Sequence, residues 1–427
     1  MDHLKGIGVN NICIILLVFN CFFSNLGLYN YRTSPALFVS ICLLILFILY
    51  NKKCFIIKEL STSMKIVIIL MQIIGTSYAI NGVIYKVPTY ILLFILFSII
   101  LPIYFIEANM IKLNKVIDIY TKANIISFLI FTFAVFLFSP INQEQYAGIF
   151  NNPNLLGEYI SVVIMSLIFQ FEKIKNNKYK SGILILFGIS VAFMIFSMSR
   201  TTLVSVVFIG IIYLIFNIRN KLNIKKKLLV FTLSILIMIP VTYGVLNIVT
   251  PLISDFTGIN LSEKFYSEKD QNKNKNEGQL DDIINMTFDR YKKGIDDDRT
   301  FSSGRIEIWK EYFENLTFGG HDSSKLYIEY NGGIIQANAH NSFLQTAYQS
   351  GIMSGVSYLM IVLFLLIFGI KRFIKNADNN ILFALMAMMS LFIYYCLSNI
   401  LVPTISFSLL PMWIIIVPYI FNYRKSF

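Results

Sequence analysis

The sequence predicts an all-α, polytopic membrane protein with about twelve transmembrane helices. Hydrophobic residues make up 56% of the chain and charged residues only 14%. Apolar runs of about 17–22 residues, the length that crosses the hydrocarbon core of a bilayer, recur along the chain. One long polar interruption, Thr250 to His340, holds 16 of the 24 acidic residues. Any chemistry is therefore expected in or beside this interval.

The apolar runs define twelve predicted spans. They lie near residues 7–28, 34–50, 64–80, 90–106, 123–138, 155–171, 181–197, 201–217, 228–248, 352–370, 380–398 and 405–421. The polar interval falls between the ninth and tenth spans. Three parts follow: spans one to nine in 1–248, a large loop with short amphipathic helices in 249–341, and spans ten to twelve in 342–427.

The basic residues predict the orientation. With the N-terminus inside, the inner links and termini hold 22 Lys and Arg, and the outer short links hold only Arg32, Lys86 and Arg200. Cytoplasmic links are enriched in these residues. We therefore expect both termini in the cytoplasm and the long loop outside. The net charge of +12 is concentrated in these short links, which is typical of topology and contact with anionic lipids rather than of nucleic-acid binding.

The outer loop divides into two parts. Residues 262–298 are rich in Lys, Asn, Asp and Glu, which predicts a solvated insert without a core. Further on, Ile306, Trp309 and Phe313 share one helical face, which predicts an amphipathic helix on the membrane surface. After a Gly-rich link at 331–333, the run around His340 is expected to enter the tenth span directly.

Three groups on the predicted outer face are candidates for chemistry: Arg200, Arg305 and His340. Each arginine has two interpretations. It is a charge at the membrane interface or at a helix start, or its guanidinium binds a phosphate or pyrophosphate through paired hydrogen-bond donors. His340 either caps the tenth span together with Asn341, or is a neutral imidazole that takes a hydroxyl proton near neutral pH.

The other candidates have weaker patterns. His321 follows a Gly-Gly turn and is a second imidazole, or simply part of the turn. Asn154 and Glu158, at the start of the sixth span, can hydrogen-bond a sugar or cap and anchor the helix. His321 and Asp322 lack further ligands at suitable spacing, so we expect no metal. The spans carry almost no charges near their middles, which disfavours a transporter.

Five motifs in order resemble the O-antigen polymerase/O-antigen ligase superfamily. They are Gly148-Ile-Phe-Asn-Asn-Pro-Asn154, Ser197-Met-Ser199-Arg200, Gly304-Arg305-Ile-Glu-Ile-Trp309, Phe318-Gly-Gly320, and Ala339-His340-Asn341-Ser-Phe-Leu ahead of Gly351. The resemblance covers about residues 145 to 360. The ligase pattern is His-Asn, nine residues, then Gly-x-x-(Gly/Thr/Tyr); here Ser354 occupies the last position and Gly355 follows.

The resemblance implies a GT-C-like, metal-independent glycosyltransferase without a cofactor. Its substrate would be an undecaprenyl-pyrophosphate-linked glycan, used at the outer face of a bacterial inner membrane. Arg200 and Arg305 would bind the pyrophosphate and stabilise its leaving charge. His340 would position or deprotonate the acceptor hydroxyl, and the eighth span would hold the lipid tail. Ser199, Trp309 and Asn341 complete the expected substrate-binding set.

Three functions are compatible with the sequence. A polymerase of surface-polysaccharide repeat units (O-antigen or capsule) is favoured, because the 262–298 insert is typical of a lineage-specific elaboration. An O-antigen ligase acting on lipid A-core is the second. An exporter of polysaccharide precursors is the non-enzyme alternative, for which charges near the middle of the membrane would be expected. A chain-length regulator and a flippase are the expected protein partners.

Overall fold

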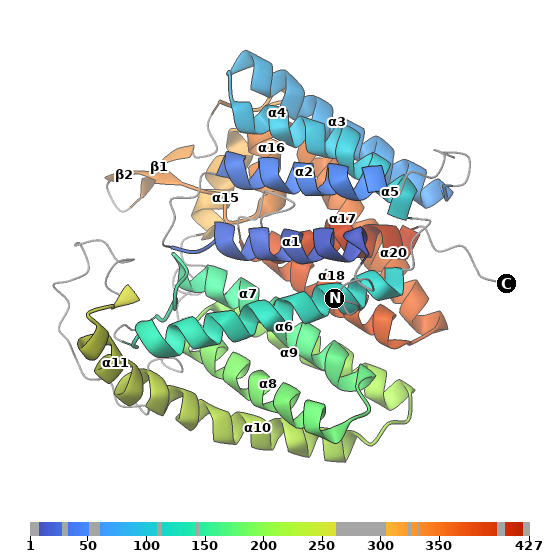
Figure 1. Cartoon of the computed structure of the whole chain (residues 1–427). Helices are drawn as coiled ribbons and strands as arrows, with labels where there is room; N and C mark the ends of the chain where they lie inside the picture. Colours follow the sequence, from blue (N-terminus) through green and yellow to red (C-terminus); the bar gives the residue numbers. More distant parts are fainter. Residues whose placement is uncertain are drawn as a thin grey trace.

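The computed structural model describes residues 8–27, 33–50, 60–108, 113–141, 145–261, 305–322, 326–330, 333–398 and 406–421. Long helices dominate it (Figure 1). The bundle helices, some of them interrupted by π-helical turns, are α1 (Val9–Ser24), α2 (Thr33–Tyr50), α3 (Thr62–Ile84), α4 (Pro88–Ile95) with α5 (Leu101–Ala108), α6 (Leu113–Phe138), α7 (Pro153–Lys173), α8 (Asn177–Ser197), α9 (Arg200–Arg219), α10 (Ile224–Gly244) with α11 (Thr250–Thr257), α17 (Ile352–Lys375), α18 (Asn379–Leu397), and α19 (Leu409–Pro411) with α20 (Val417–Phe421).

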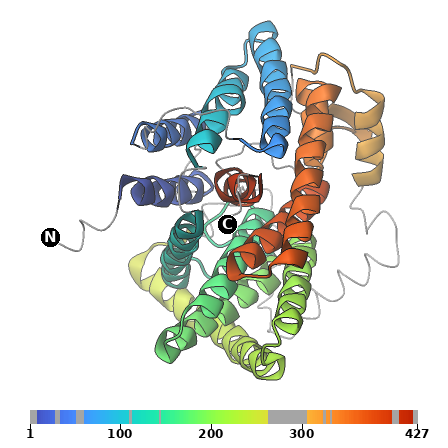
Figure 2. The ribbon, with the colours of Figure 1, turned by 90° about the vertical axis from the view of Figure 1, so that its right-hand side faces the viewer.

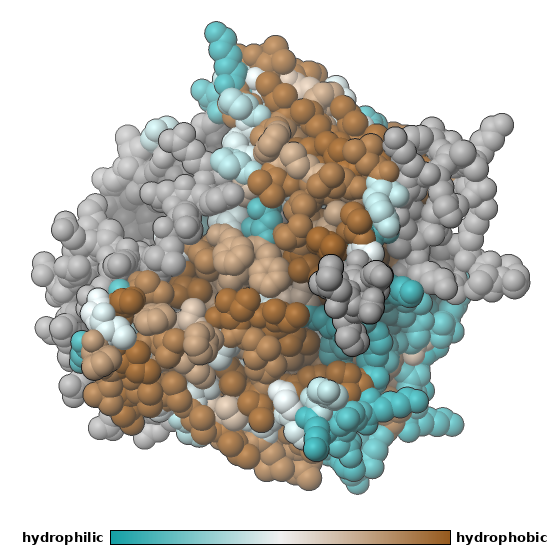
Figure 3. Space-filling model, in the orientation of Figure 1, coloured by the Kyte–Doolittle hydropathy of each residue, from teal (hydrophilic) through white to brown (hydrophobic). Residues whose placement is uncertain are grey.

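These helices agree with a multi-pass membrane protein. Nine helices in the described part are long and apolar enough to cross a membrane, and three shorter apolar ones span Val9–Ser24, Ser34–Tyr50 and Leu409–Phe421. Apolar residues cover most of the face in Figure 3, and hydrophilic residues gather where α8, α9 and α10 meet. We call the end of the bundle where α7 and α9 begin the site end, and the opposite end, where they finish, the basic end.

Helix α7 is the centre of the bundle. In its most apolar window 89% of the residues are buried, against 44% for the neighbouring helices α6 and α9. It packs against α6, α8, α9 and α18. Because both ends of α7 carry polar residues with partners on neighbouring helices, its position relative to those helices is fixed.

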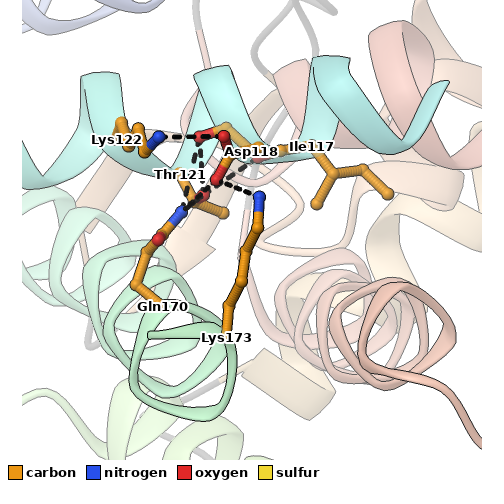
Figure 4. Close-up of polar contacts among 6 residues, drawn as sticks. All are labelled: Ile117, Asp118, Thr121, Lys122, Gln170 and Lys173. Carbon is orange, nitrogen blue, oxygen red and sulfur yellow. Dashed lines mark hydrogen bonds and ion pairs between the residues drawn. The ribbon is translucent and has the colours of Figure 1, made fainter. Parts of the chain in front are cut away.

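At the basic end, the end of α7 is bonded to the start of α6 (Figure 4). Asp118 accepts from Lys173 Nζ at 2.7 Å and from Lys122 Nζ at 2.9 Å. Gln170 Nε2 donates to Asp118 Oδ1 at 2.9 Å and to Thr121 Oγ1 at 2.7 Å. This cluster keeps polar residues helical, which explains why α6 begins at Leu113 rather than near 123 as predicted.

A second ion pair ties the same end of α7 to α9 and α10. Lys227 Nζ lies 2.6 Å from Glu172 Oε1 and donates to Asn217 Oδ1 at 2.8 Å. Tyr213 donates its hydroxyl to the same carboxylate. The side chains of this pair are only 19% and 10% exposed, so the charges compensate each other away from bulk water.

The ninth predicted span is longer than expected. It was predicted to end near 248, but a helix 34 residues long runs from Ile224 to Thr257. Pro251 would interrupt an ordinary α-helix, yet it lies in the first turn of α11, just after the π-helical turn Val245–Val249. The Thr250 hydroxyl donates to Phe136 O at 2.8 Å, which holds this junction against α6.

The last helical segment lies inside the bundle. Every residue from Leu409 to Phe421 is buried, and Figure 2 shows this segment (dark red) end-on, surrounded by other helices. Thirteen residues make a helix of about 20 Å, short of the roughly 30 Å of a hydrocarbon core. Its place depends on long-range packing, because neighbouring helices cover it on all sides.

The segment between α11 and α17 contains elements that were not predicted. Helix α15 (Arg305–Glu314) was expected. The hairpin of β1 (Leu326–Tyr330) and β2 (Gly333–Ala337), which pairs Leu326 with Ala337, was not. Nor does His340 lead directly into the tenth span, since a separate helix, α16 (Ser342–Ser350), intervenes. The insert predicted at 262–298 lies outside the described residues.

The break between α16 and α17 falls at Gly351. Its φ of +96° lies in a region that side chains rarely adopt, and a Cβ there would lie 2.1 Å from Phe318 O. Ile352 N donates to Thr317 O at 3.1 Å beside it. The Gly351 of the ligase-type pattern is therefore where the segment between α11 and α17 contacts the start of α17.

Candidate functional site

Arg200 is placed by a close approach of α7 to α9. A Cβ on Gly157 would lie 1.9 Å from Thr202 Oγ1, so only glycine lets the two helices come this near. Ser199 Oγ caps α9 by accepting from Thr202 N, and donates to Asn154 Oδ1 at 3.0 Å. Asn154 and Ser199 thus hold the start of α9, whose first residue is Arg200.

A buried chain of hydroxyls supports this cap. Thr202 Oγ1 donates to Ser199 Oγ at 2.8 Å and lies 3.0 Å from the hydroxyl of Tyr394. The Tyr394 hydroxyl also lies 3.0 Å from Ser161 Oγ. All four side chains are buried. Tyr394 on α18 was missed from the sequence, because nothing in the local pattern of an apolar helix indicates a contact 192 residues away.

Arg305 begins α15, which packs on the chain that carries His340. Ile308 and Tyr312 are buried against Ala339, Leu344 and Tyr348. Trp309 Nε1 donates to Ala339 O at 2.7 Å, and Ala339 N donates to Gln345 Oε1 at 2.9 Å. Residue 339 is thereby held from both sides. Gln345, like Tyr394, was not predicted.

His340 follows directly in an uncommon backbone conformation. Its φ is +48°, in the left-handed region that few non-glycine residues occupy. Asn341, not His340, caps α16: its Oδ1 accepts from Leu344 N at 3.0 Å, and its Nδ2 donates to Cys396 O at 3.3 Å. His340 is exposed, and its imidazole makes no hydrogen bond or ion pair with another described residue.

The three predicted groups, Arg200, Arg305 and His340, interact electrostatically. Desolvation and the charge of Arg200 lower the pKa of Arg305. Partial desolvation and the charge of Arg305 lower the pKa of His340 from its usual 6.5. His340 is therefore mainly neutral at pH 7 and can accept a proton, while positive charge is concentrated beside it. An anion bound here would relieve this repulsion.

Glu158 lies inside the bundle rather than at the surface. It is 5% exposed, accepts from Ser406 Oγ and from Ser408 N, each at 2.7 Å, and so holds the start of α19. A sugar does not reach a carboxylate that is buried and engaged in this way. We therefore remove Glu158 from the substrate-binding set.

His321 packs at the far end of α16 from His340. Its ring stacks on Tyr348 with centroids 4.0 Å apart, and its Nδ1 lies 2.9 Å from Tyr348 O. Since α16 rises about 1.5 Å per residue, the two histidines mark ends of the helix roughly 12 Å apart. His321 and Asn341 fasten α16 in place, and we assign neither a contact with substrate.

The described residues contain no group of three or more His, Cys, Asp or Glu that could hold a metal ion. The polar groups at the site are instead arginines, an imidazole, amides and hydroxyls. They sit where the segment between α11 and α17 meets the long apolar helices. The fold is that of a polytopic membrane protein.

The family follows from a direct match. The model of the O-antigen ligase family matches residues 185–359, which run from α8 to α17 and include Arg200, Arg305 and His340. The match covers less than half of the chain, and it confirms the resemblance to the O-antigen polymerase/O-antigen ligase superfamily. The match supports a membrane enzyme of this class. No curated protein and no solved structure matches the chain.

Proposed function

We propose that the protein is a polymerase that joins undecaprenyl-pyrophosphate-linked oligosaccharide repeat units into a surface polysaccharide. The observation that carries the proposal is electrostatic. The charge of Arg200 acts on Arg305 and the charge of Arg305 acts on His340, so two cationic groups lie beside one neutral base. This is the arrangement needed to receive a pyrophosphate and, next to it, a hydroxyl that must lose its proton.

The transfer is a single displacement. The acceptor sugar hydroxyl attacks the anomeric carbon of the donor glycan, a new C–O bond forms, and the bond from that carbon to the pyrophosphate oxygen breaks. The hydroxyl proton goes to His340. Negative charge grows on the departing undecaprenyl pyrophosphate, where Arg200 and Arg305 stabilise it. Attack from the face opposite the leaving group inverts the anomeric configuration, and no metal is needed.

Helix α9 offers a path for the lipid tail. Arg200 lies at the head of an exposed apolar stripe on the same helical face. The stripe consists of Val204, Val207, Ile211, Ile215 and Ile218, which are 37–64% exposed. These positions follow Arg200 at 4, 7, 11, 15 and 18 residues, the spacing of one face. A tail along this stripe would place its pyrophosphate at Arg200.

The ligase is the second candidate, favoured by the description of the matched family. Ser354, which replaces the last residue of the ligase pattern, is buried and accepts from Ser350 Oγ at 2.8 Å. A Cβ on Gly355 would lie 2.5 Å from Ala347 Cβ, so the close contact between α16 and α17 is at Gly355, one residue after the last position of the ligase pattern. This departure supports the polymerase. The exporter is disfavoured because, among the described residues, Glu158 is the sole fully buried charged side chain.

The glycan phenotype of a deletion strain tests the proposal. A polymerase mutant is expected to cap its surface lipid with single repeat units. Full-length chains that remain on undecaprenyl pyrophosphate would instead establish the ligase. Unpolymerised units retained on the cytoplasmic side would point to export.

The same strain, complemented with reporter fusions at the 220–223 and 258–261 links, tests the proposed orientation with the site end outside.

A further inference from the structure

Helix α15 has three distinct faces. With about 100° between successive residues, Ile308 and Tyr312 share the face buried against the protein. Ile306 and Phe313, seven residues apart, share a neighbouring flank and are 59% and 65% exposed. The remaining flank is acidic. It carries Glu307, Glu311 and Glu314, all exposed.

The placement of α15 gives this flank a direction. In Figure 1, α15 runs across the long axes of the bundle helices, and in Figure 2 it lies at the right-hand rim, beyond α17. A helix that lies across the bundle at its site end is parallel to the membrane plane. In that position, one exposed flank of such a helix would face lipid and the other would face water.

The chain after α15 joins it to the lipid-facing side of α17. Phe318 is 79% exposed, and its neighbour Thr317 accepts the hydrogen bond of Ile352 N at the start of α17. From there an exposed apolar stripe runs the length of α17. It consists of Met353, Val356, Met360, Leu363, Ile367, Ile370 and Ile374, which are 38–61% exposed. The apolar side chains of the outer segment thus continue the lipid-facing surface of a membrane span.

We propose that the apolar flank of α15 and Phe318 dock on phospholipid, with their side chains among the upper acyl chains of the leaflet at the site end. Amphipathic helices that lie in the interface bind in this way, with the polar side in water. The acidic flank then faces away from the lipid headgroups. If the proposed function holds, docking also fixes the height of Arg305, the first residue of α15, at the level of lipid-linked phosphate.

Nitroxide labels test the docking. In full-length protein with its five native cysteines replaced, single labels are placed at Ile306→Cys, Phe313→Cys and Phe318→Cys, with Glu311→Cys and Glu314→Cys as matched controls. The protein is placed in nanodiscs of phosphatidylethanolamine and phosphatidylglycerol. We expect the first three labels to be relaxed more by oxygen than by a water-soluble nickel chelate, and the two controls to show the reverse.

Two results would overturn the proposal. Equal relaxation by the nickel chelate at all five positions would mean that α15 stands in water. Protection of Phe313→Cys from both reagents would mean that protein, such as a second copy of the chain, covers the flank. A label-free measurement guards against effects of the labels: in Trp413→Phe protein, where Trp309 is the remaining tryptophan, brominated acyl chains should quench its fluorescence. None of these readouts requires turnover, so the docking can fail while the proposed reaction stands, and the reverse.

Discussion

Trp309 of α15 donates a hydrogen bond of 2.7 Å to the carbonyl oxygen of Ala339, the residue immediately before His340. This contact joins the helix that begins with Arg305 to the backbone that presents the imidazole. The positions of Arg305 and His340 are thus fixed by the same local contact. The contact also explains why a tryptophan in the outer segment is half-buried rather than exposed.

Trp309→Phe should therefore lower activity more than stability. The ring is kept, but the bond to residue 339 is lost, which costs about 1 kcal/mol and allows His340 to shift. We expect a roughly five- to tenfold loss of polymer per molecule of enzyme. Trp413→Phe is the matched control, because among described residues the Trp413 indole nitrogen has no hydrogen-bond partner. It should lower thermal stability and leave the activity of the folded protein intact. The opposite pattern would contradict this role of Trp309.

Gly157→Ala should disrupt the placement of Arg200. Its Cβ would lie 1.9 Å from Thr202 Oγ1, so α7 and α9 must move apart and the bond from Ser199 to Asn154 must break. We expect more than a tenfold loss of activity, measured on protein that still extracts as a monodisperse species. In the interior of α9, a Cβ on Gly210 would meet nothing within 4 Å. Gly210→Ala should therefore be neutral or stabilise by up to about 1 kcal/mol. Equal losses of activity in both variants would show that the close contact between α7 and α9 does not place Arg200.

The pKa of His340 can be measured directly, because the chain has three histidines. In isotope-labelled protein, His340 should titrate below 6.5. Arg305→Gln removes a positive charge that disfavours the imidazolium, so the pKa should rise, and bound pyrophosphate should raise it further. Activity needs the neutral base, so it should fall as pH drops through the lowered pKa and be constant above it. If the pKa of His340 does not change in Arg305→Gln, the charge of Arg305 does not act on the imidazole.

Glu158 should matter for stability rather than for transfer. Glu158→Ala leaves Ser406 and the amide of Ser408 without their buried acceptor, at a cost of about 1–3 kcal/mol. Glu158→Gln keeps an acceptor oxygen and should lose less. Both should transfer glycan normally at temperatures where they remain folded. If Glu158→Ala has normal stability but no activity, Glu158 belongs to the substrate-binding set after all.

The sequence predicted the elements that depend on local pattern. Apolar length and helical spacing sufficed to predict most of the bundle helices and α15. The grouping of Arg200, Arg305 and His340 was also predicted, from motifs; their roles remain proposals. Of the predicted amphipathic face, Ile306 and Phe313 are exposed; the second apolar face, with Ile308 and Tyr312 buried against the protein, was not predicted.

The remaining features depend on contacts between distant parts of the chain. Glu158 looks like a helix-start carboxylate until Ser406 and Ser408, 248 and 250 residues away, are seen to donate to it. The hairpin of β1 and β2 consists of short strands whose pairing a single sequence does not specify strongly. Helix α16 ends because the backbone of Phe318 occupies the space beside Gly351, which the local sequence does not reveal.

The central claim is that Arg200, Arg305 and His340 form one metal-independent transfer site. Its most direct test is the elongation of purified undecaprenyl-pyrophosphate-linked repeat units in the presence of EDTA, with Arg305→Ala compared with Lys310→Ala on the same helix. Wild-type protein and Lys310→Ala should both form polymer, whereas Arg305→Ala should form none. Polymer from Arg305→Ala at the wild-type rate, or strict dependence of the wild-type protein on a divalent ion, would contradict the account.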